Sequence, residues 1–297
     1  MIAVPEGKAS FRPEDLWFNE KIMKKVEMHR NAQSVYFGIN PGIVFKKGGF
    51  ALKLRCYFDR IGQQDYQELV KFAGERKIPL LEITCNKADI KEDRREWRSI
   101  PRQTVVISLT DSLDEVWKSF DSKRRNQILK AGKEGVSVIG EYSDAAFEEW
   151  WRIYVSTSKR GKFVPYGKSL IEDLLKNGPC KLFVALYQGK VISGNVVAFN
   201  NYPYWWLGAS LREYGKLNAP SILQWETIKF AKESGYDLYD LGGLASDTRS
   251  GPEKFKLSFN GEVVRYETIE ISLGMFFPSL VRGMRHFYYD ILKRQAL

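Results

Sequence analysis

The alternation of short apolar runs with longer amphipathic stretches restricts the fold of this chain more than any other feature. Strand-like runs at residues 34–39, 50–57, 79–85 and 104–109 surround a helix-like stretch at 63–76. Such alternation is typical of α/β and mixed α+β domains, in which helices cover a sheet. The sequence therefore predicts a mixed α/β fold.

The second half of the chain repeats this alternation with stronger helix signals. Ser112 and Glu115 have the spacing of a capping box, and Gly135 predicts the end of a basic helix that begins near residue 122. Ser143 or Asp144 can cap the next helix. A further helix is expected at 219–234 and strands at 136–140, 181–187, 190–199, 202–208, 237–241 and 263–271. The pattern thus runs twice along the chain.

The length favours two domains, because 297 residues exceed the usual size of one. No low-complexity linker interrupts the sequence, so we expect a packed boundary near residues 120–140. No run approaches the roughly 18 apolar residues of a membrane span, and the N-terminus lacks the apolar stretch of a secretory signal. We therefore expect a soluble, cytoplasmic protein.

The charge balance favours a polyanionic partner. Lys and Arg outnumber Asp and Glu by 46 to 36, which gives a net charge of +10. Nucleic acid, an anionic membrane face or a phosphorylated substrate would suit this balance, and so would a generic basic surface. Four residues of the basic helix are candidates for phosphate contacts, namely Lys123, Arg125, Lys130 and Lys133. The alternative is that they form an ordinary solvated helix face.

Several chemistries are absent from the sequence. It has no phosphate-binding P-loop, no dinucleotide-binding glycine turn, no H-E-x-x-H and no G-x-S-x-G motif. The two histidines, His29 and His286, cannot form a metal cluster between them, and three scattered cysteines favour neither disulfides nor a metal site. We expect an enzyme without a metal, a covalent nucleophile or a cofactor.

Three stretches carry a family resemblance. The first is the strand at 101–109 followed by the helix at 122–136, with a Lys-x-Arg opening and an Ala-x-x-x-Gly-Val close. The second is Thr-x-x-Arg at 157–160 with Tyr166 beyond it, and the third is Asp-Leu-Gly-Gly at 240–243 followed by Phe-Lys at 255–256. In order and spacing they resemble the FemABX peptidyltransferases over about residues 35–272. The long helical arm of some members has no counterpart here, and Leu129 replaces the helix's second arginine.

The resemblance implies two domains of the GNAT acetyltransferase fold, each a twisted mixed sheet flanked by helices. We place them at residues 1–125 and 126–272, with 273–297 forming a C-terminal helix that packs back on them. It also implies an aminoacyltransferase that forms peptide bonds without the ribosome. The donor would be aminoacyl-tRNA, and the acceptor an amine of a nucleotide- or lipid-linked cell-wall peptide precursor.

Site residues follow from the same resemblance. Lys256 would be catalytic, stabilising the oxyanion that forms when an amine attacks an ester carbonyl. Arg160 and Tyr166 would bind a diphosphate or carboxylate. The further substrate-binding residues would be Lys21, Phe255, Gly242 and Gly243, and tRNA would contact the four basic residues of the helix.

Two alternatives stay open. The segment 212–217 partly matches the pyrophosphate loop of N-acyltransferases that use acetyl-CoA or another acyl-CoA, and it precedes a predicted helix whose N-terminus could bind the anion. The basic C-terminal helix, with Arg282 and Arg285 beside aromatic residues, can rest on an anionic membrane face or pack in the core. The sequence therefore predicts an acyltransferase whose donor is either aminoacyl-tRNA or an acyl-CoA.

Overall fold

The structure is a computed structural model that describes residues 19–29, 32–47, 50–91, 97–244 and 251–273. The chain consists of two compact units, each with more contacts among its own residues than with the other unit. The larger unit is Thr104–Val264, and the smaller unit combines the described residues of Phe11–Gln103 and of Arg265–Leu297. Strands β5 (Trp97–Ser108) and β11 (Glu262–Ser272) carry the chain from one unit to the other.

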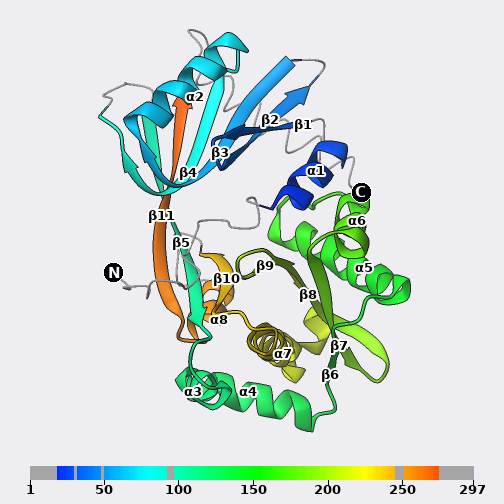
Figure 1. The fold of residues 1–297 in the computed structure, drawn as a ribbon. Helices are drawn as coiled ribbons and strands as arrows, with labels where there is room; N and C mark the ends of the chain where they lie inside the picture. Colours follow the sequence, from blue (N-terminus) through cyan, green and yellow to red (C-terminus); the bar gives the residue numbers. More distant parts are fainter. Residues whose placement is uncertain (1–18, 30–31, 48–49, 92–96, 245–250, 274–297) are drawn as a thin grey trace. The chain divides into compact units, whose positions relative to one another are not determined.

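The smaller unit contains a mixed sheet with the strand order β1-β2-β3-β4-β11-β5 (Figure 1). β3 and β4 are parallel, and the pairs β1–β2, β2–β3 and β4–β11 are antiparallel. Its elements besides β5 and β11 are α1 (Glu20–His29), β1 (Ala32–Phe37), β2 (Asn40–Lys47), β3 (Phe50–Gly62), α2 (Gln63–Glu75) and β4 (Leu80–Asp89).

Helix α2 supplies the core of the smaller unit. Its residues Tyr66, Leu69 and Ala73 recur at helical spacing and are buried against apolar residues of β3, β4 and β11. The Asp65 carboxylate accepts the Gly62 backbone N–H at 2.9 Å, which satisfies a free donor at the helix start. The helix of the parallel β3–α2–β4 connection is therefore packed on the sheet of the smaller unit.

The larger unit contains the strand order β5-β10-β9-β8-β7-β6. Strands β6 to β9 are antiparallel neighbours, and β9 and β10 are parallel. Its strands after β5 are β6 (Ser137–Ile139), β7 (Cys180–Tyr187), β8 (Lys190–Phe199), β9 (Pro203–Ser210) and β10 (Leu238–Leu244). Its helices are α3 (Leu113–Ser119), α4 (Ser122–Lys133), α5 (Asp144–Gly161), α6 (Lys168–Asn177), the 3₁₀ helix η2 (Arg212–Leu217), α7 (Ala219–Glu233) and α8 (Gly251–Leu257).

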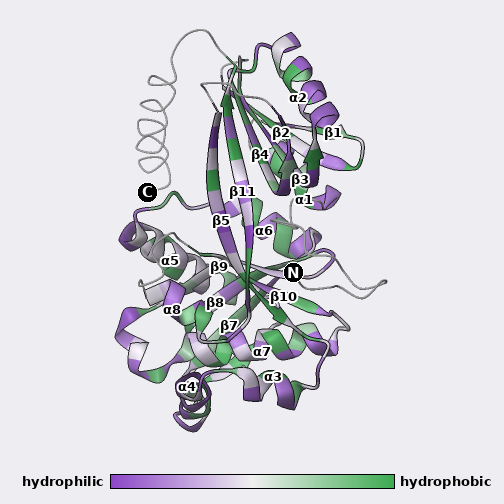
Figure 2. Cartoon of the chain, turned by 90° about the vertical axis from the view of Figure 1, so that its left-hand side faces the viewer, coloured by the Kyte–Doolittle hydropathy of each residue, from purple (hydrophilic) through white to green (hydrophobic). Residues whose placement is uncertain are grey.

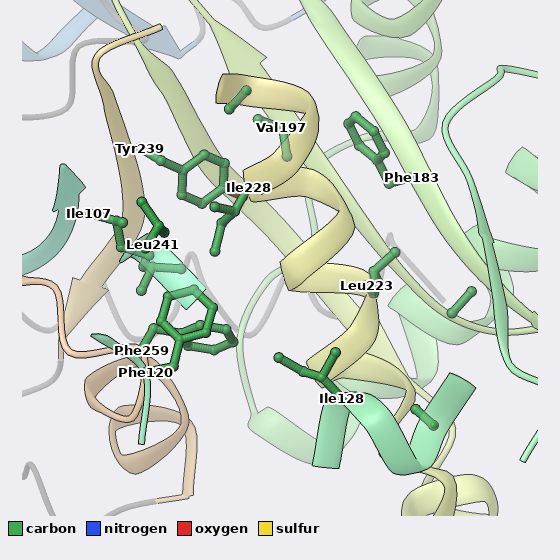
Figure 3. Packing of buried hydrophobic residues seen from close by; sticks show 14 of the residues in the cluster. Ile107, Phe120, Ile128, Phe183, Val197, Leu223, Ile228, Tyr239, Leu241 and Phe259 are labelled. Carbon is green, nitrogen blue, oxygen red and sulfur yellow. The ribbon is translucent and has the colours of Figure 1, made fainter. Parts of the chain in front are cut away.

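Helix α7 forms the centre of the larger unit's core. Leu223 and Ile228 of α7 pack with Ile128 of α4 and with Tyr239 and Leu241 of β10 (Figure 3). Helices α5 and α6 contact the same sheet through β7, β8 and β9. The helix–sheet packing confirms the predicted mixed α/β fold.

Local sequence signals position several of these elements as predicted. Ser112 accepts the Glu115 backbone N–H at 3.3 Å while the Glu115 carboxylate accepts the Ser112 N–H at 2.9 Å, so the capping box is formed. Ser143 caps α5 through the Ala146 N–H at 3.1 Å. Gly135 follows α4 with φ +86, a left-handed conformation that favours glycine. Strand β2 and helices α1, α6 and α8 were not predicted.

The units differ from the predicted domains. The expected boundary between residues 125 and 126 falls inside α4, within the larger unit. The physical reason is that β10 lies beside β5, which places the second part of β5 in the larger unit's sheet. Periodicity shows where strands occur but not which distant strands pair. The expected C-terminal helix lies beyond residue 273, outside the described residues.

Candidate active site

The parallel pairing of β9 and β10 is short, since its register contains a single pair, Tyr204 with Asp240. Beside it the β8–β9 register shifts, because Val196 pairs with Leu207 and Val197 with Trp205. Trp206 is thus the extra residue of a β-bulge, a feature that redirects side chains. This end of β9 is therefore irregular in both of its pairings.

The bulge directs two adjacent tryptophans to different neighbours. The Trp205 ring lies 6.0 Å from the Phe255 ring, and the Lys256 amine lies 5.3 Å from the Trp205 ring centroid. The Trp206 ring meets the Tyr166 ring edge-on at 4.8 Å. Two of the predicted site segments, around Tyr166 and Lys256, thus contact consecutive residues of β9.

Asp240 and Gly242 shape the loop that faces Lys256. The buried Asp240 carboxylate accepts the Gly242 N–H at 2.7 Å and a hydrogen bond from the Thr104 hydroxyl. Gly242 has φ +78, and a Cβ there would lie 2.9 Å from the Trp205 carbonyl oxygen. Only glycine fits this turn without strain. Asp240 therefore holds the turn at Gly242 in place.

Lys256 is held at the end of this loop. Its Nζ donates to the Gly243 carbonyl at 2.7 Å, while Gly243 itself is exposed. Burial lowers the pKa of Lys256, and the nearby carboxylates of Asp240 and Glu253 oppose that effect. An ammonium group carries three donors, so a protonated Lys256 bound to one carbonyl can still donate to an oxyanion. The arrangement suits electrostatic catalysis at a carbonyl.

A cavity of about 830 Å³ lies on another side of α8, at the start of α7. Among the described residues its lining includes four basic side chains (Lys123, Arg124, Arg212 and Lys254) and one acidic side chain, Asp121. Pro220 and Ser221 of the first turn of α7 also line it, where the positive end of the helix dipole favours anions. The cavity therefore suits a phosphate-bearing ligand. Lys256 is not among its lining residues.

The basic helix α4 contributes unequally to this cavity. Lys123 lines it, and Lys130 and Lys133 are exposed on the same helical face. The hydrophilic colour of α4 is visible in Figure 2. Arg125 instead donates to the Lys118 carbonyl at 2.8 Å and to the Phe120 carbonyl. Because successive residues turn by about 100°, Arg125 lies on the opposite side from Lys123. The structure thus separates Arg125 from the other three residues.

Arg160 lies in the last turn of α5, and Tyr166 follows a few residues after that helix ends. Arg160 Nη2 donates to the Ser210 carbonyl at 2.9 Å and to Thr157 Oγ1 at 3.0 Å, which fixes the guanidinium against the end of β9. The Tyr166 N–H donates to the Tyr154 hydroxyl at 3.2 Å. Ser210 is five residues from Trp205, or roughly 16 Å along a strand. The Arg160 and Lys256 groups therefore suit two ends of an extended substrate rather than one cluster.

Lys21 is exposed in the first turn of α1, in the smaller unit. Phe255, predicted to bind substrate, lines the cavity, with the Arg124 guanidinium 4.2 Å from its ring centroid. Within the described residues, no group of three or more His, Cys, Asp or Glu side chains is placed to hold a metal ion. In the same part of the chain, no helix is long and apolar enough to cross a membrane.

Arg124 is a candidate site residue that was not predicted from the sequence. This arginine is 93% buried and lines the cavity. The signal was present, since Arg124, Ile128 and Ala131 recur at i, i+4 and i+7, and the last two are core residues. A cation on the apolar stripe of a basic helix points inward, unlike its neighbours.

Comparison with known proteins agrees with this geometry. Residues 121–257 match the acetyltransferase (GNAT) domain family. A stretch of 154 residues, 50% of this chain, is 25% identical to the UDP-N-acetylmuramoylpentapeptide-lysine N(6)-alanyltransferase of Weissella viridescens. That stretch spans 46% of the relative, about half its length.

Solved structures share the fold. A crystal structure of FemX matches with a TM-score of 0.60 and 15% identity, over 83% of this chain and 90% of that chain. The structure of L-PGS from Bacillus licheniformis matches with a TM-score of 0.59 and 12% identity, over 91% and 96%. These likenesses confirm the predicted GNAT-like fold.

Proposed function

Because this chain belongs to the FemABX family, we propose that it transfers an aminoacyl group from aminoacyl-tRNA to an amine of a cell-wall peptide precursor. The observation that carries the proposal is the position of Lys256. It occupies the family's Phe-Lys position, and its half-buried amine is held at the Gly243 carbonyl, three residues after the single β9–β10 pair at Asp240. The relative from Weissella viridescens is named for transfer of alanine to a lysine of such a precursor.

The proposed reaction is a direct transfer. The neutral acceptor amine attacks the ester carbonyl carbon of the donor, a C–N bond forms, and the C–O bond to the tRNA ribose breaks. The nitrogen loses one proton and the departing ribose oxygen gains one. Lys256 donates to the carbonyl oxygen as its negative charge develops, and alignment of the two substrates supplies further acceleration. The proposal includes no metal and no cofactor, since the donor is a substrate.

The cavity at the start of α7 supports a phosphate-bearing donor. Its basic lining and the adjacent exposed Lys130 and Lys133 suit the acceptor end of a tRNA. Arg160 and Tyr166 are proposed for the diphosphate or a carboxylate of the precursor, and Lys21 for the same substrate. A cytoplasmic location belongs to this proposal, because charged tRNA is found there.

An acyl-CoA donor is the second candidate. The match of residues 121–257 to the GNAT acetyltransferase domain favours it, as do Arg212 and Gly215, which line the cavity just before α7. The chain would then be an N-acyltransferase acting on an amine with the same lysine. The acceptor need not change between the two candidates.

One experiment distinguishes the donors. The protein is incubated with UDP-N-acetylmuramoyl-pentapeptide and either a pool of charged tRNAs or acetyl-CoA, and the mass of the precursor is measured. Addition of one amino-acid residue mass with charged tRNA supports the proposal, and a gain of one acetyl group supports the alternative. A precursor unchanged under both conditions contradicts the proposed acceptor.

A further inference from the structure

Arg124 connects three helices of the larger unit. From α4 its Nε donates to Ser258 Oγ at 2.8 Å, just after α8, and its Nη1 donates to Ser221 Oγ of α7. Nη1 also donates to Gln127 Oε1 at 2.8 Å, and Nη2 to the Phe255 carbonyl of α8 at 3.4 Å. The side chain thus joins α4 and α7 to both the body and the end of α8.

The charge of Arg124 is solvated by these neutral groups. In the part of the chain that the structure describes, no carboxylate lies within ion-pair distance of the guanidinium. The guanidinium lies over two rings, Phe255 at 4.2 Å and Phe259 at 5.0 Å. Burial lowers the pKa of Arg124 to about 10, so the group stays charged at neutral pH. A buried cation without these partners would be costly, which links its position to that of α8.

Helix α8 depends on such anchors because it has only seven residues. A helix of that length is not stable on its own. Its C-terminal end is further held by the Asp121 N–H, which donates to the Ser258 carbonyl at 3.1 Å, and by Asn260 Nδ2, which donates to the Ser119 carbonyl at 2.7 Å. Arg124 contacts α8 from the cavity, whereas Lys256 extends from α8 to the Gly243 carbonyl outside the cavity lining.

We propose that Arg124 is a positioning residue for the transfer reaction: through Ser258 and Phe255 it fixes α8, and thereby the amine of Lys256. The consequence for catalysis rests on the proposed function, while the consequence for α8 does not. Lysine cannot replace Arg124, because one ammonium cannot reproduce a planar fork that donates to Ser258, Ser221 and Gln127 together. A displacement of about 1 Å at a catalytic group can cost about 100-fold in rate.

The first test is kinetic. Arg124→Ala should lower kcat by roughly 10- to 100-fold and change KM for the acceptor much less. Because Arg124 borders the cavity, added guanidinium at millimolar concentration can enter the vacated space and should restore part of kcat. The matched control is Arg76→Ala in the smaller unit, which removes another guanidinium stacked on a phenylalanine, 3.7 Å from the Phe72 ring centroid. It should lose no activity and gain none from guanidinium.

The second test does not require activity. Amide hydrogen exchange is measured on peptides covering residues 251–259 and, for comparison, α5. Faster exchange confined to 251–259 in Arg124→Ala supports the proposal, and unchanged exchange there overturns it. Faster exchange throughout the larger unit also overturns it, because Arg124 would then stabilise the whole core.

If Arg124→Ala does not fold, Ser258→Ala removes the acceptor of its Nε and should give a smaller, equally local increase in exchange; no increase would overturn the proposal. If the parent protein transfers nothing from charged tRNA or acetyl-CoA, the proposed function fails, while the exchange data still decide whether Arg124 fixes α8.

Discussion

Replacing Lys256 with alanine removes an amine that donates to the Gly243 carbonyl at 2.7 Å and lies 5.3 Å from the Trp205 ring centroid. If this amine stabilises the oxyanion, kcat should fall about 10²- to 10³-fold, or about 2.7–4 kcal/mol, as loss of one such donor does. KM should change little, because the interaction strengthens only in the transition state. The free energy of unfolding should fall by only about 1–2 kcal/mol, the sum of one net hydrogen bond and a weak cation–π contact.

The assay is steady-state transfer to the precursor, with thermal unfolding recorded on the same preparation. The matched control is Lys229→Ala, since Lys229 is also half-buried, lies 5.8 Å from the Trp225 ring centroid and pairs with Glu226 at 2.8 Å. Both variants should lose similar stability, and only Lys256→Ala should lose turnover. Turnover of Lys256→Ala within a few-fold of the parent would refute the catalytic role.

The pH dependence gives an independent check on the same residue. Lys256 acts only when protonated, so its contribution is present below its pKa and is lost as the pH rises through it. Burial lowers that pKa, and the alkaline loss of kcat should therefore begin below the value of about 10.4 typical of lysine. An alkaline limb that persists unchanged in Lys256→Ala would assign it to another group.

Three further predictions concern the anion site, the loop and the smaller unit. Replacing Lys123, Lys130 and Lys133 with alanine should flatten the log–log salt slope of tRNA binding by about 0.7–0.9 for each phosphate that the protein no longer neutralises. Arg125→Ala should leave the slope unchanged. Filter binding at several salt concentrations measures both. Gly242→Ala should lower the melting temperature by several degrees, because a φ of +78 costs alanine about 1–2 kcal/mol. The added Cβ would also lie 2.9 Å from the Trp205 carbonyl oxygen, which adds to that cost. Gly243→Ala is the control variant. Burial raises the pKa of Glu82, but the ion pairs with Arg55 at 2.6 Å and Lys53 at 3.1 Å outweigh burial and lower that pKa to about 2. Glu82 should therefore contribute about 3 kcal/mol to the free energy of unfolding. This contribution is fully present above about pH 4.3 and is lost as the pH falls through 2. Acid unfolding of Glu82→Gln beside the parent measures that contribution, and equal pH dependence of the two would contradict it.

The sequence could predict much of the fold because its strongest signals are local. The capping box at Ser112, the cap at Ser143 and the glycine after α4 depend on residues a few positions apart. The division into units could not be predicted in the same way. It depends on β5 pairing beside β10, between strands more than a hundred residues apart, and no periodicity encodes that neighbour.

Helix α4 shows the same distinction within one candidate site. Composition marks Lys123, Arg124 and Arg125 alike as consecutive cations, yet a turn of about 100° per residue sends them in three directions. Lys123 reaches the cavity mouth, Arg124 enters the core beside α8, and Arg125 binds the carbonyls that end α3. The helical register was readable from Ile128 and Ala131, so the burial of Arg124 was predictable. What it would meet there was not, since Ser221 and Ser258 come from segments about 100 and 130 residues away. A charge count therefore identifies a basic helix, whereas the contacts by which Arg124 links this helix to α8, the helix that carries Lys256, become visible only in three dimensions.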